Sequence, residues 1–146
     1  MLVFMTFLGC AMQQGRALMP AEIAQNGSHH FESSPEQTFE ASLAALKAQG
    51  YEIAGANRKK GTITTMPKLV RAVAQRSAPG TAQAVELYRR YRLMLSADGK
   101  GTKVIAEPSV FVGNRDISSD PVWDIEGPMG ERSLWAQLFR EIQGGL

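Results

Sequence analysis

The longest regular feature of the sequence is an alternation of apolar and polar side chains from Val85 to Ala97. Successive side chains of a β-strand point to opposite faces, so this stretch predicts a strand with one apolar and one polar face. A single charged residue, Arg89, interrupts the apolar face. The turn sequence at 98–101, Asp-Gly-Lys-Gly, predicts a hairpin into a second strand, Thr102–Val112. The fold must therefore cover one face of a sheet.

Two amphipathic helices are predicted to provide that cover. The first spans 35–49, because Ser34 precedes a proline at the first helical position and Gln37 follows at the position of a capping box. Gly50 is a typical helix stop. The second spans Glu131–Gln143, where leucine and isoleucine recur along one face.

The remaining segments predict short strands and loops. His29–Ser33 predicts a short strand, and Tyr51–Asn57 with Thr62–Met66 predicts a hairpin. The segment Pro67–Ala84 predicts a loop with at most a short helix, because Ala-Pro-Gly at 78–80 breaks its weak helical period. Gly113–Gly130 predicts an acidic loop in which Trp123 is the large apolar anchor.

Together these elements predict the α+β class. We expect a small antiparallel sheet of four to five strands, with two helices packed on one face. The length of 146 residues leaves room for one such domain beside a short leader.

The only cysteine of the chain, Cys10, directly follows a run of nine apolar or small residues. This arrangement is typical of a bacterial lipoprotein signal, in which the thiol receives a diacylglycerol. We therefore predict a signal peptide at 1–9, a lipidated Cys10 with a flexible tether at 10–28, and a single domain at 29–146. The alternative is that 1–9 is a buried strand and Cys10 is an inert core thiol.

A family resemblance follows from the lipobox cysteine, the polar spacer, the passage SPEQTFEASLAALKAQGYEI at 34–53, the KKGTI hairpin and the terminal amphipathic helix. In this order they resemble small bacterial envelope lipoproteins of the helix-grip type, such as the domains of a lipoprotein component of the outer-membrane β-barrel assembly machinery. The resemblance implies a helix-grip-like fold and a periplasm-facing, lipid-anchored location. Ala11 stands where enteric lipoproteins retained at the inner membrane carry aspartate, so the resemblance favours the outer membrane.

The charges are strongly polarised along the chain. Residues 58–103 carry a net charge of +9, whereas the segments on either side are acidic and the whole chain carries +2. A basic surface near a membrane would attract anionic lipid or an acidic envelope protein. The alternative is that these are solvated hairpin charges, partly paired with the acidic loop. The candidate contact surface comprises Arg58, Lys59, Lys60, Lys68, Arg71, Arg89, Arg90 and Arg92.

Recognisable catalytic patterns do not occur in the sequence. The two histidines, His29 and His30, are neighbours in a predicted strand and would point to opposite faces. No nucleophile elbow, phosphate-binding loop or spaced metal-ligand set is present. We therefore predict no enzymatic activity, no cofactor, no metal site and no nucleic-acid partner.

Two functions remain as predictions. The first is a non-enzymatic envelope protein that acts as an accessory or assembly module, with the basic hairpin face and the segment Lys68–Ala84 as contact regions. The second is a carrier of a small apolar ligand or lipid in a cavity between sheet and helix. An enclosed pocket lined by Phe39, Leu43, Leu93 and Leu138 would favour the carrier.

Overall fold

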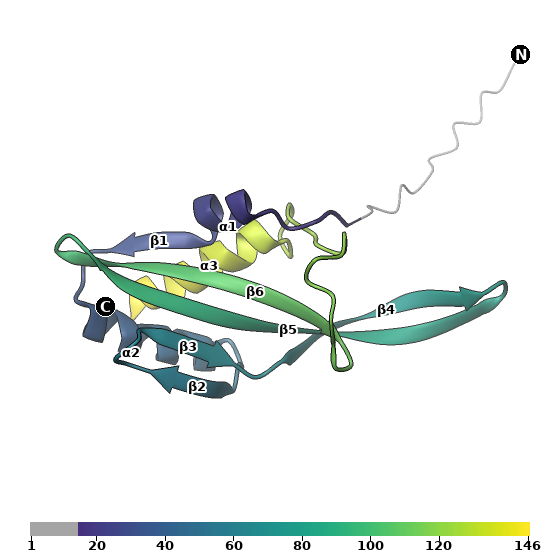
Figure 1. Cartoon of the computed structure of the whole chain (residues 1–146), viewed down its shortest axis with the longest axis horizontal. Coiled ribbons are helices and arrows are strands. Elements are labelled where there is room, and N and C mark those ends of the chain that lie inside the picture. The colour runs from purple at the N-terminus through teal and green to yellow at the C-terminus, as the bar shows by residue number, and fades with distance from the viewer. Residues whose placement is uncertain (1–14) are drawn as a thin grey trace, which may run out of the picture.

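The computed structural model describes residues 15–146, and for 73–78 and 81–83 it describes the backbone only. Cys10 and the predicted signal segment 1–9 lie outside the described residues. The structure is of the α+β class, with helices packed against one antiparallel sheet (Figure 1). None of the helices within 15–146 is long and apolar enough to cross a membrane.

The sheet has seven strands rather than the predicted four to five. The central order is β1-β6-β5-β3-β2, and β4 and β7 add to β5 and β6. The strands are β1 (Ser28–Phe31), β2 (Ile53–Asn57), β3 (Thr62–Thr65), β4 (Lys68–Ala78), β5 (Thr81–Asp98), β6 (Gly101–Val112) and β7 (Arg115–Asp116). The predicted hairpins are confirmed, with β5 paired to β6 from Leu87 to Asp98.

The helices are α1 (Pro20–Asn26), α2 (Pro35–Ala48) and α3 (Glu131–Gly144). The start of α2 confirms the predicted cap, because the Ser34 hydroxyl accepts a hydrogen bond from the Gln37 amide at 3.2 Å. The predicted stop is also confirmed, since Gly50 adopts a φ of 85°, a conformation that costs glycine little.

The main core lies between the sheet and the two long helices. Phe39 and Leu46 of α2 and Trp135 and Leu138 of α3 pack against the apolar face of β5, where Leu93 is fully buried. The alternation predicted for Val85–Ala97 thus selects the face that the helices cover. A second, smaller cluster lies under the loop before α3 and contains Leu87, Val110, Ile117, Trp123 and Ile125.

The predicted loop at Pro67–Ala84 is instead a hairpin, which adds one of the two strands beyond the five predicted segments; the other is the short β7. Lys68–Ala78 forms β4, and the Pro79-Gly80 pair that breaks the helical period is the turn into β5. Gly80 has a φ of 88°, as a tight turn requires. Pairing with β5 overrides the weak local preference of this alanine-rich stretch.

The segment predicted as the last part of a flexible tether packs against the domain. From Gly15 onward the chain is described, and it includes α1 and the first residue of β1. Leu18 and Ile23 are partly buried against the main core. The Ala106 amide also donates to the carbonyl of Gly27 at 2.7 Å. Two isolated apolar residues give no periodic signal, so the sequence pattern did not reveal this packing.

Candidate functional site: the projecting arm and its root

The end of the β4–β5 hairpin projects beyond the rest of the sheet (Figure 1). β5 pairs with β6 only from Leu87 onward, so residues 72–86 form a two-stranded ribbon. We call residues 72–86 the arm. Lys68–Arg71 and Leu87–Arg89, which pair where the ribbon joins the sheet, form the arm root. β4 pairs only with β5, so its other edge is open along the described backbone.

Three of the predicted basic residues lie at the arm root: Lys68, Arg71 and Arg89. The Nζ of Lys68 donates to the carbonyl of Gln49 and lies 5.0 Å from the centre of the Tyr51 ring, which ties the root to the end of α2. Arg71 is exposed, and its Nη1 lies 2.7 Å from the Oδ2 of Asp124. This ion pair joins the basic hairpin to the acidic loop, as the alternative interpretation of the charges anticipated.

Arg89 does not belong to a contact surface, which corrects the sequence prediction. Its exposed fraction is 4%, and its guanidinium forms an ion pair with Glu131 and a hydrogen bond with the Tyr91 hydroxyl. Burial raises the pKa of Glu131, and the positive charge of Arg89 opposes that rise. The signal for this pair was present in the sequence: a lone arginine on an apolar strand face needs a buried acidic partner.

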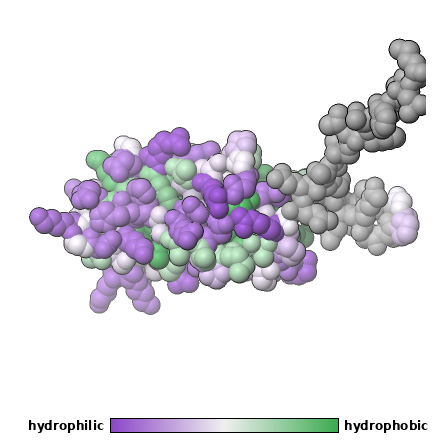
Figure 2. Space-filling view, turned by 90° about the horizontal axis from the view of Figure 1, so that it is seen from above, coloured by the Kyte–Doolittle hydropathy of each residue, from purple (hydrophilic) through white to green (hydrophobic). Residues whose placement is uncertain are grey.

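The other predicted basic residues are distributed over two further regions. Arg90 and Arg92 lie on the sheet face opposite the long helices, and the Arg90 guanidinium stacks over Phe111 at 4.8 Å. Arg58, Lys59 and Lys60 form the β2–β3 turn. The eight residues therefore do not form one surface, and Arg58 forms an ion pair with Glu40. Figure 2 shows hydrophilic residues interspersed with hydrophobic ones on the face seen from above.

The β2–β3 turn borders a cleft of about 440 Å³ beside the start of α2. Its apolar lining comes from Phe39, Leu95 and Ala97, and its basic rim from the turn. Of the four residues predicted to line a ligand cavity, only Phe39 lines this cleft. Leu93 and Leu138 are fully buried in the main core, Phe39 is 3% exposed, and Leu43 packs against the same cluster. Side chains therefore fill the space between sheet and helices at the predicted cavity.

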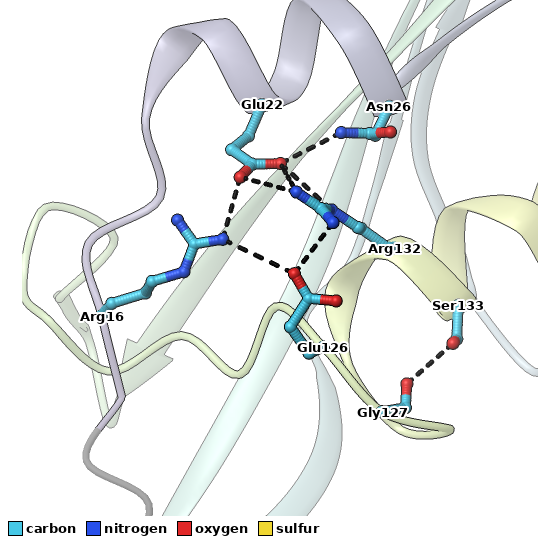
Figure 3. Close-up of polar contacts among 7 residues, drawn as sticks. All are labelled: Arg16, Glu22, Asn26, Glu126, Gly127, Arg132 and Ser133. Atoms are coloured by element: carbon cyan, nitrogen blue, oxygen red, sulfur yellow. Dashed lines mark hydrogen bonds and ion pairs between the residues drawn. The ribbon is translucent and has the colours of Figure 1, made fainter.

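The N-terminal segment is fastened to the domain by a cluster of charged side chains that we call the clasp: Arg16, Glu22, Glu126 and Arg132 (Figure 3). Glu22 of α1 accepts from Arg16 at 2.9 Å and from Arg132 of α3 at 3.1 Å. Arg132 also pairs with Glu126 at 2.8 Å. Hydrogen bonds from the two arginines hold the pKa of Glu22 below its ordinary value.

Comparisons with known proteins leave the family open. No family model matches the chain, and no curated protein matches it. Among solved structures, the crystal structure of a DUF4468 family protein from Bacteroides ovatus aligns with 81% of this chain and 77% of its own. The identity is 12% and the TM-score is 0.37, a likeness too small to bear on activity or partners.

Proposed function

We propose that this protein is a non-enzymatic interaction or accessory module of the bacterial cell envelope, anchored by lipid on Cys10 and facing the periplasm, with the outer membrane favoured. The lipobox cysteine and the spacer before an α+β domain, which resemble small bacterial envelope lipoproteins, support the location. The arm is the observation that supports the mode of action, because it is an extended element that projects away from both core clusters.

The arm suits the addition of a strand from a partner protein. A two-stranded ribbon is marginally stable by itself in water, and an open edge offers unpaired backbone groups to another chain. Alanines are frequent in the sequence of the arm, and alanine has a low preference for strands. Main-chain hydrogen bonds to a partner strand along β4 would stabilise the arm and give the affinity. The partner is therefore an envelope protein with an extended segment.

The test combines lipid labelling with site-specific crosslinking in the native host. A clickable fatty acid is expected to label the wild-type chain and not Cys10→Ser. A photo-crosslinking amino acid at Ala72, which is exposed on β4, is expected to form an adduct with one envelope protein. The same amino acid at Ala136, on the exposed face of α3, serves as the control and should form none.

The lipid label and the crosslink test different parts of the proposal. A wild-type chain without the lipid label would contradict the proposed anchor. A labelled chain that forms the same adducts from positions 72 and 136 would contradict the proposal that the arm is the contact element. A chain whose arm is shortened by replacing residues 72–86 with Asn-Gly lacks position 72, so formaldehyde takes the place of the photo-crosslinker in this comparison. The shortened chain should keep the lipid label and lose the formaldehyde adduct with the envelope protein that the full chain gives, which excludes capture by the body of the domain.

A further inference from the structure

The position at which the N-terminal segment leaves the domain is fixed. The backbone of Arg16 exchanges two hydrogen bonds with Trp123, at 2.9 and 3.0 Å. Gly15 lies so close to the loop segment beside it that a Cβ there would stand 2.7 Å from the carbonyl carbon of Val122. The residues before Gly15 therefore start from the loop that precedes α3, whatever path they take afterwards.

The same loop contacts the arm root. Asp124, next to Trp123, forms the ion pair with Arg71 of β4. The amide of Glu131 donates to the carbonyl of Asp124 at 2.8 Å, which brings the start of α3 to this place as well. The exit of the chain, the arm root and the loop before α3 thus form one continuous region of the surface, which we call the exit region.

Large apolar side chains are exposed around the exit region. Leu69 and Val70 of β4 are 49% and 43% exposed, Met129 of the loop is 78% exposed, and Met19 before α1 is 54% exposed. The charges here are largely satisfied by one another, since Arg71 pairs with Asp124 and the clasp contains two acids and two arginines. The chemistry of this surface therefore favours an apolar partner over a charged one.

We propose that the exit region lies against the lipid bilayer and that Leu69, Val70 and Met129 enter the headgroup region. This inference rests on the anchor at Cys10. Five peptide units separate Cys10 from Gly15, and a chain of that length spans at most about 18 Å. So short a connection holds the exit region at the membrane surface. Partial burial of exposed apolar side chains at the interface then orients the domain.

This orientation places the arm close to the membrane surface. Its root touches the bilayer, so the arm reaches partners in the same membrane. The β5–β6 turn lies at the other end of β5, about 30 Å along the strand from Tyr88 to Ala97. That end faces away from the exit region, beyond the reach of the tether.

The test uses the full lipidated protein in phosphatidylcholine vesicles that contain a headgroup-spin-labelled lipid. Once Cys10 is lipidated, the chain has no other thiol, so Val70→Cys or Met129→Cys gives a single site for a fluorescent label. Ala97→Cys, also at an exposed residue, is the matched control. We expect several-fold stronger quenching at 70 and 129 than at 97, and little change when anionic lipid is added.

Equal quenching at all three positions, or stronger quenching at 97, would overturn the orientation. A requirement for anionic lipid would overturn the apolar character of the contact. Mass spectrometry of the purified protein detects the lipid on Cys10 independently of the quenching. A protein without the lipid would contradict the proposed anchor, whereas a lipidated protein with unquenched labels at 70 and 129 would contradict only the proposed orientation.

Discussion

Arg89 and Glu131 show how one buried charge pair connects distant parts of the chain. Arg89 belongs to β5 at the arm root, and Glu131 is the first residue of α3. Their exposed fractions are 4% and 2%. The Nε of Arg89 is a buried side-chain nitrogen without a partner among the described residues. The pair is therefore costly to bury, and each charge depends on the other for compensation.

Removing one member of the pair is expected to destabilise the fold strongly. In Glu131→Ala the guanidinium of Arg89 stays buried without its counter-charge, so the free energy of unfolding should fall by about 3–5 kcal/mol. The double variant Arg89→Met with Glu131→Leu removes both charges and should recover most of that loss. Urea unfolding followed by tryptophan fluorescence measures both. Equal losses in the single and double variants would show that packing, not charge, dominates this position.

At the scale of elements, the sequence predicted those helices and strands whose formation depends on interactions between residues close together in the chain. The capping box at Ser34 and the alternation in β5 each involve neighbouring residues, and both elements were predicted with ends within a few residues. β4 was missed because its strand form depends on pairing with β5, not on its own alanine-rich sequence. The candidate surface failed at Arg89 because its residues were chosen by charge along the chain, although the alternation in β5 places Arg89 on the apolar face that the helices cover.

The arm is expected to be dispensable for folding. None of its described side chains belongs to either core cluster. Arg71 and Leu87 face each other in the ladder, so an Asn-Gly turn can connect them in place of residues 72–86. The free energy of unfolding should then stay within about 1 kcal/mol of that of the full chain. Chemical denaturation measures it, and a loss of several kcal/mol would mean that the arm is part of the folding unit.

At the scale of the whole molecule, the clasp makes the attachment of the N-terminal segment depend on pH. The folded pKa of Glu22 is lowered by hydrogen bonds from Arg16 and Arg132, so ionised Glu22 stabilises the attached state. That stabilisation is complete above the ordinary pKa of 4.5 and is lost as the pH falls through the lowered folded value.

Acid should therefore loosen residues 16–26 before the core unfolds. Heteronuclear NOE values of these residues are expected to fall between pH 7 and about pH 3, while those of β5 and β6 stay high. Glu22→Gln carries no titrating group and should show low values at both pH values. If the wild-type values do not change, the backbone pairing at Trp123 and the packing of Leu18 and Ile23 hold the segment without the clasp.

The contacts that attach the N-terminal segment, including the clasp, also determine where a pulling force on that segment acts in the molecule. Tension applied through the first residues reaches the hydrogen bonds between Arg16 and Trp123, and then the ion pairs of Glu22 and Arg132. Arg132 belongs to α3, so the force passes into the helix that fills the core. The arm lies outside this path. A pull on the proposed anchor would therefore strain the body of the protein and leave the arm unloaded.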